Sequence, residues 1–176
     1  MPPLDRMDPE AYPFPRRYQF TTINLRNTYR SYAAPGAATN LATHALFNGS
    51  SGDRVLVVRG FTQSGTTGAS IAPMATQRGV TGTHAGTEFP LWSGERQPAG
   101  QHWYQDTANA LVPQQLNTPA TSNIISFVGS VPLAVLQPGW SFVWQGNAAA
   151  LTVIFQWIWE ELPVNDPILG VVGAYG

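Results

Sequence analysis

A run near the C-terminus alternates so regularly between two kinds of side chain that it constrains the fold more than any other segment. One face of residues 151–160 is wholly apolar: Leu151, Val153, Phe155, Trp157 and Trp159. The other face is mixed: Thr152, Ile154, Gln156, Ile158 and Glu160. A period of two is the period of a β-strand, and aromatic and β-branched residues favour strands. The run is therefore predicted to be an inner strand of a β-sandwich, with Trp157 and Trp159 in the core.

The same kind of signal recurs along the chain, and no convincing amphipathic helix appears. Short β-prone runs alternate with clusters of Gly, Pro, Asn and Ser, which is typical of strands joined by turns. Further strands are expected at Tyr18–Leu25, Leu41–Phe47, Arg54–Thr62, His102–Tyr104, Ile124–Val128, Leu133–Leu136 and Trp140–Gln145. Asn48-Gly49 and Gly146-Asn147 are expected to form turns, the second within a C-terminal hairpin. The predicted fold is all-β, an antiparallel β-sandwich of jelly-roll type spanning residues 18–162.

Three segments depart from this pattern. Residues 1–17 contain five prolines and are expected to form an extended arm. Its proposed partner-binding residues are Tyr12, Phe14, Arg16 and Arg17, although a disordered terminus remains open as an alternative. Residues 64–100 are rich in Gly, Thr and Pro and are expected to form a long loop excursion. Residues 163–176 form an apolar C-terminal tail, for which the proposed partner-binding residues are Val164, Ile168, Leu169 and Tyr175.

Charge is unusually scarce in this chain. Charged residues make up 11% of the 176 residues, against about 25% in an ordinary soluble domain. All nine basic residues are Arg, and Arg and aromatics are enriched at protein interfaces whereas Lys is depleted. The composition favours a subunit of an assembly, although a GC-rich genome alone could also supply the Arg codons.

Several classes of function are disfavoured by the same composition. A net charge of −1 with no basic patch argues against nucleic-acid binding. The longest apolar stretch, residues 148–159, is too short for a membrane helix, and no signal peptide is visible at the N-terminus. Because the chain has no cysteine, it has neither a disulfide scaffold nor a cysteine nucleophile.

The chain offers few residues suited to catalysis. His84, Glu88, His102 and Asp106 are the only grouping with metal-ligand residue types, but they lie in a Gly- and Thr-rich context without a ligand motif. No Gly-x-Ser-x-Gly or phosphate-binding loop occurs. Glu160 and Glu161 should point to opposite faces at a solvated strand end. The prediction is a non-enzymatic protein with no catalytic residue, metal or cofactor; a cupin-like metalloenzyme is a remote alternative.

Three aromatic residues suggest a binding function instead. The irregular middle segment of the sequence contains Trp92, Trp103 and Tyr104. If exposed there, these rings could stack on the faces of sugars. Together they support an alternative function, a glycan- or receptor-binding module. The simpler interpretation is that these rings fill the sandwich edge or a seam between subunits.

Residues 130–161 resemble the closing strands of small β-sandwich accessory proteins in tailed-bacteriophage virions. A hydrophobic strand at 131–136 leads to the turn Gln137-Pro138-Gly139, in which Pro and Gly suit the central positions of a type II turn. A strand beginning Trp140-Ser141 and a long last strand ending Trp159-Glu160-Glu161 follow. The resemblance implies a capsid decoration, cement or fibre-base protein, located in the virion and bound to the major capsid protein or other virion proteins. It also implies a homo-oligomer, with a trimer favoured. It implies no catalytic residues. Under the alternative function, the glycan- or receptor-binding module would belong to a phage fibre or tail.

Overall fold

All regular secondary structure in the described part of the chain is β-strand. The computed structural model describes residues 27–65, 71–93, 96–111, 116–119, 124–129, 131–146 and 148–166. The strands are β1 (Thr28–Tyr32), β2 (Leu41–Asn48), β3 (Arg54–Gly65), β4 (Ile71–Arg78), β5 (Thr83–His84), β6 (Thr87–Pro90), β7 (Gly100–Thr107), β8 (Leu116–Pro119), β9 (Ile124–Val128), β10 (Ala134–Leu136), β11 (Trp140–Gln145) and β12 (Val153–Pro163). No helix among these residues is long and apolar enough to cross a membrane.

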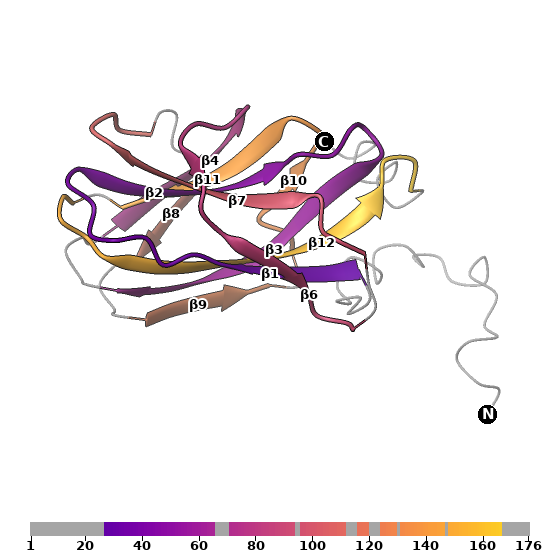
Figure 1. Ribbon diagram of the computed structural model, residues 1–176, viewed down its shortest axis with the longest axis horizontal. Helices are drawn as coiled ribbons and strands as arrows, with labels where there is room; N and C mark the ends of the chain where they lie inside the picture. Colours follow the sequence, from indigo (N-terminus) through magenta and orange to yellow (C-terminus); the bar gives the residue numbers. More distant parts are fainter. Residues whose placement is uncertain are drawn as a thin grey trace.

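The strands form two antiparallel sheets that pack face to face, which confirms the predicted all-β sandwich (Figure 1). Sheet A has the order β10-β3-β12-β1-β6, with β9 also paired to β3, and sheet B has the order β5-β7-β2-β11-β4-β8. Strands β1 to β4 alternate between the two sheets. The first and last described strands, β1 and β12, are neighbours in sheet A.

The alternation of strands between sheets corrects two local predictions. The turn at Asn48-Gly49 was expected to join neighbouring runs through positive φ angles, but β2 and β3 lie in different sheets and the positive φ of this connection is at Gly52. The predicted C-terminal hairpin is also wrong, because β11 lies in sheet B and β12 in sheet A. Both connections cross from one layer to the other, so their flanking strands face each other across the core.

The core lies between the layers and is dominated by aromatic rings. The alternation predicted for residues 151–160 is confirmed, because Val153, Phe155, Trp157 and Trp159 are all buried on the inner face of β12. Their rings meet those of the opposite sheet, with centroids 5.1 Å apart for Trp144 and Phe155. Large rings carry much of the apolar area that folding removes from water, so this cluster supplies much of the stability.

The predicted loop excursion at 64–100 is wrong for much of its length. It contains β4, which pairs with both β11 and β8 inside sheet B, and the short strands β5 and β6. Met74 and Ala75 of β4 are fully buried. The segment was misread because Pro73 and the small or polar residues of β4 weaken its strand pattern, and pairing on both sides overrides that weakness.

The turn between β10 and β11 has the predicted geometry. The Trp140 N–H donates to the Gln137 carbonyl over 3.0 Å, and Gly139 has a φ of 79°. Pro138 sets the first central φ and Gly139 supplies the positive φ required at the second central position of a type II turn. A side chain at Gly139 would therefore strain the turn even though the space around it is open.

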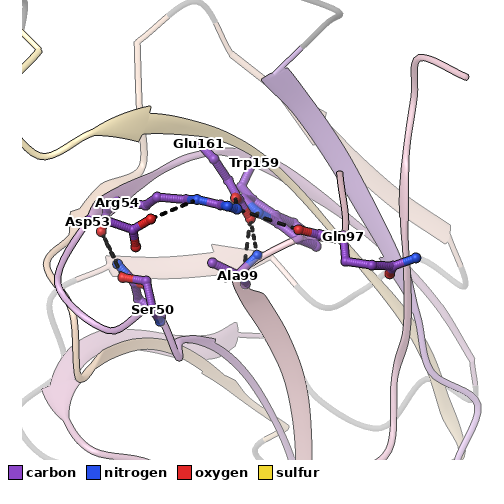
Figure 2. Close-up of polar contacts among 9 residues, drawn as sticks. Ser50, Asp53, Arg54, Gln97, Ala99, Trp159 and Glu161 are labelled. Atoms are coloured by element: carbon purple, nitrogen blue, oxygen red, sulfur yellow. Dashed lines mark hydrogen bonds and ion pairs between the residues drawn. The ribbon is translucent and has the colours of Figure 1, made fainter. Parts of the chain in front are cut away.

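Glu161 anchors one end of β12 rather than facing solvent (Figure 2). Its Oε1 accepts hydrogen bonds from the backbone N–H groups of Ala99 and Gly100 and from the Trp159 indole, and its Oε2 pairs with Arg54 over 2.7 Å. Glu160 is also buried, so the predicted solvated strand end is wrong. The two carboxylates do point to opposite faces, as the strand period predicts. Glu161 joins β12 and β3 to the start of β7.

The predicted strand at Tyr18–Leu25 and the arm at residues 1–17 lie outside the described residues. The first described strand is instead Thr28–Tyr32, which sequence analysis did not predict. Of the tail at 163–176, residues 163–166 are described, and the Val164 N–H donates to the Asp53 carbonyl over 3.0 Å.

Candidate docking face

The outer face of sheet A, turned away from the core, is the strongest candidate for a functional surface. Its composition follows from register. Tyr29 and Ser31 point inward, so Arg30 and Tyr32 point outward. Across the ladders, Arg30 lies between Phe89 of β6 and Ile158 of β12. The remaining strands contribute, on the same face, Ile154 and Gln156 from β12, Thr62 from β3, and Ser126 and Val128 from β9.

Half of this face is open to solvent. Tyr32 is 41% exposed and Val128 47%, and Phe89 and Ile154 are exposed to a similar extent. We call these four residues the open face. Arg30, across the ladder from Phe89, is the charged residue beside them. The other polar neighbours named above are uncharged, and the hydroxyls of Thr62 and Ser126 hydrogen-bond over 3.2 Å. Large exposed apolar residues on one face of a sheet, with few charges to desolvate, are typical of a protein-binding site.

The other half of the face is buried and holds an ion pair. Arg59 of β3 and Glu160 of β12 are 1% and 3% exposed. Glu160 Oε2 accepts from Arg59 Nε over 2.8 Å and from an Arg59 terminal nitrogen over 2.6 Å, and both residues make further contacts. The register between β3 and β12 shifts at Ile158/Trp159, opposite Arg59. This bulge lets Arg59 point outward while Val58 and Phe61 stay in the core.

Arg30 is the one residue of the outer face whose charge is not matched within the described structure. The side chain is half-buried between Phe89 and Ile158, and its Nε is buried without a hydrogen-bond partner. None of the ion pairs between described residues involves Arg30. A guanidinium that is partly removed from water and lacks a partner costs free energy, because its donors are left unsatisfied.

A second polar cluster lies inside the sandwich and joins the two sheets. The Trp157 N–H donates to Ser31 Oγ over 3.1 Å, and Ser31 Oγ lies 2.9 Å from His102 Nδ1. His102 Nε2 lies 3.0 Å from His44 Nδ1. A neutral imidazole has one donor and one acceptor nitrogen. When the Ser31 hydroxyl donates to His102 Nδ1, His102 Nε2 therefore donates to His44 Nδ1. The remaining proton of the His44 ring is then on Nε2, which has no hydrogen-bond partner.

Burial favours the neutral form of both histidines in this series of hydrogen bonds. Burial holds the pKa of His44 well below its usual value of 6.5, with a smaller contribution from His102. Burial also lowers the pKa of His102 to about 3, with a smaller contribution from His84. The His44 ring stacks on Phe155 at a centroid distance of 4.9 Å, and both histidines are fully buried. These side chains are shielded from any substrate in solution, so their role is structural.

The residues considered as metal ligands are only partly brought together. His84 Nε2 lies 2.9 Å from Glu88 Oε1, which also accepts the backbone N–H of His102. The His102 ring, however, points into the sandwich, and Asp106 accepts the N–H groups of Thr39 and Asn40 elsewhere. Within the described ranges, no three His, Asp or Glu side chains are placed to hold a metal ion.

The three aromatics of the glycan-binding alternative do not share one surface. Tyr104 packs on the core cluster beside His44, at a ring distance of 5.2 Å. Trp103, its neighbour on β7, packs on the opposite face against the cluster of Ala45, Ala75, Leu111 and Val143. Trp92 is 47% exposed and follows β6 of sheet A. A stacking platform that includes both Trp103 and Tyr104 is therefore not formed.

Most residues proposed for the arm and the tail lie outside the described residues: Tyr12, Phe14, Arg16, Arg17, Ile168, Leu169 and Tyr175. Val164 is described and exposed. Sequence analysis missed the open face, the ion pair and the histidine chain. To predict the open face, sequence analysis would have had to assign Ile154 and Val128 to the outer surface of a sheet. That assignment depends on which strands pair, and the pairing strands are far apart in the sequence.

Comparisons with known proteins add no relationship to these observations. No protein-family model matches the chain, and neither a curated protein nor a solved structure matches it significantly. The functional argument therefore rests on the geometry and on the physical chemistry of the residues.

Proposed function

We propose that this chain is a non-enzymatic structural protein of a virion, a capsid decoration or cement subunit that binds the viral shell through the open face. The observation that carries the proposal is the open face itself, because Tyr32, Phe89, Val128 and Ile154 expose apolar side chains on the outer face of one sheet. Burying such a surface against a partner gains free energy at roughly 25 cal/mol per Å² before the cost of association.

The strand order supports the finer part of the proposal, a jelly-roll topology. A jelly roll is a double sheet of two Greek keys, a fold common in viral capsid proteins. The alternation of β1 to β4 between sheets, the pairing of β1 with β12, and the position of β11 between β2 and β4 fit that scheme. In this interpretation β5, β6 and β7 are an insertion that widens both sheets.

The burial of the acidic and histidine side chains favours a binding role over a catalytic one. Glu161, Glu160 and His102 are each buried and engaged in contacts that join strands. A catalytic acid or base needs access to a substrate, which these groups lack. The resemblance of residues 130–161 to tailed-phage accessory proteins supports the virion as the location and favours a trimer, and the scarcity of charge supports an assembly subunit.

Polar substitutions on the open face test the proposal. The double variant Val128→Ser and Ile154→Ser removes two exposed apolar groups, so its fold should be intact while its incorporation into particles falls at least about tenfold. The measurement is the amount of chain per particle, by quantitative mass spectrometry, when each variant replaces the wild-type chain.

A matched control keeps this experiment specific. Trp140→Ser removes an exposed aromatic from β11 of sheet B, and its incorporation should remain close to that of the wild type. Normal incorporation of the double variant would contradict the proposed use of the open face.

A further inference from the structure

We infer that Arg30 is the specificity residue of the open face and that it binds a carboxylate carried on an apolar surface of another protein. This inference rests on the proposed docking function and names the chemistry of the partner. The starting observation is a mismatch within the described structure, since Arg30 projects from an apolar and uncharged face and its Nε is buried with no hydrogen-bond partner.

The contrast with Arg59 on the same face shows what Arg30 lacks. Arg59 donates two hydrogen bonds to Glu160 and is fully buried. Arg30 lies across the β1–β12 ladder from Ile158, and in the ladder to β6 it faces Phe89. A guanidinium presents a planar fork of donors that matches a carboxylate, so an acidic side chain is the natural complement when the surrounding surface is dried by docking.

A second copy of this chain is a poor occupant for the same face. The described carboxylate on the outer face of sheet A is Glu160, which is buried against Arg59. A two-fold contact through the open face would bring together two Arg30 side chains in one dry interface without an acid for either. Like charges in a desolvated contact oppose association. The partner is therefore a different protein surface, apolar and bearing Asp or Glu.

The inference predicts opposite effects on stability and on docking. Arg30→Met keeps the length and apolar character of the side chain but removes a charge without a described partner. The free protein should unfold at an unchanged or higher temperature, while incorporation into particles falls at least about tenfold. Arg78→Met, at an exposed position of β4, is the control for the loss of one positive charge and should change neither quantity. A lower unfolding temperature, or normal incorporation of Arg30→Met, would overturn the inference.

The absence of lysine from the sequence provides a direct probe of the partner. Arg30→Lys introduces the single side-chain amine of the chain, which a zero-length carbodiimide reagent can join to a carboxylate in contact with it. Crosslinking in particles, followed by mass spectrometry, should join position 30 to Asp or Glu of another virion protein. A crosslink to a second copy of this chain, or none in particles that contain the variant, would overturn the inference.

These results separate the inference from the proposed function. If Val128→Ser with Ile154→Ser abolishes incorporation but Arg30→Met does not, the open face docks without Arg30 and only the inference fails. If none of these variants changes incorporation, the docking function fails with it.

Discussion

Acidifying the purified protein from about pH 7.5 to about pH 5 is expected to lower its free energy of unfolding by roughly 4 kcal/mol. The cause is the buried pair of histidines, His44 and His102, whose pKa values are lowered by burial in the folded state and return to about 6.5 in the unfolded chain. At pH values between the folded-state and unfolded-state pKa values, the unfolded chain binds more protons than the folded protein. Stability is therefore complete above about pH 6.5 and decreases as the pH falls toward the folded-state values.

The size of this effect follows from the number of groups and from what surrounds them. Below about pH 6.5 each histidine contributes a slope of about 1.4 kcal/mol per pH unit, and a typical domain has only about 5–15 kcal/mol to lose. The titratable groups near the pair are His84, which contributes to the lowered pKa of His102, Glu88, which accepts the His102 backbone N–H, and Tyr104, whose ring lies 5.2 Å from that of His44. Of these, Glu88 approaches the backbone of His102 and not its ring, so it does not neutralise an imidazolium.

Urea unfolding at a series of pH values between 5 and 7.5 measures this prediction, because carboxylates titrate mainly below that window. His44→Phe keeps the aromatic packing and removes one titratable group, so its slope should be about half that of the wild type. His84→Gln, at an exposed position, should leave the slope nearly unchanged. A wild-type stability that is flat over this window would show that the histidines are not buried as neutral groups.

Breaking the Arg59–Glu160 pair from one side is expected to cost about 3–5 kcal/mol. Either Arg59→Met or Glu160→Gln removes one charge of a pair whose members are 1% and 3% exposed, so the other buried charge loses its 2.6 Å ion pair. The free energy of unfolding, measured by denaturant titration near pH 7.5, should fall by this amount for each single variant.

The double variant separates the pair energy from the other contacts of these residues. Arg59→Met with Glu160→Leu should cost much less than the two single effects added together, because no charge is then left unpaired. Asp53→Asn, which affects an exposed pair with Arg54 at 3.5 Å, should change stability by less than about 1 kcal/mol. The account would be contradicted if the two single losses of stability added up in the double variant, or if each single loss were below about 1 kcal/mol, because Arg59 and Glu160 would then act independently.

The strongest local patterns allowed much of the fold to be predicted. The alternation of β12 and the Pro138-Gly139 turn depend on residues close in sequence, and both are present in the structure. β1 was missed because its inward Ser31 is polar and its outward Tyr32 is aromatic, which reverses the usual placement of polar and apolar side chains. Ser31 points inward because its hydroxyl hydrogen-bonds with His102. The two residues are 71 positions apart in the sequence, so no local pattern indicates this contact.

The candidate docking face could not be predicted for a related reason. Whether Ile154 or Val128 is exposed depends on which strands pair and on what covers each face, and both are properties of the whole fold. The Arg59–Glu160 pair joins residues 101 positions apart and also requires a bulge. Composition predicts an interaction surface, since a chain with 11% charged residues must expose uncharged ones, and this stays a prediction. Composition does not indicate where on the fold such a surface would lie.

Hydroxyl-radical footprinting of the free protein and of the particle-bound protein tests the central claim most directly. The account predicts that Tyr32 and Phe89, exposed in the free subunit, become protected in particles, while exposed Trp140 of sheet B keeps its reactivity. Unchanged labelling of Tyr32 and Phe89 in particles that contain the chain would contradict the account, because the open face would then remain in contact with water.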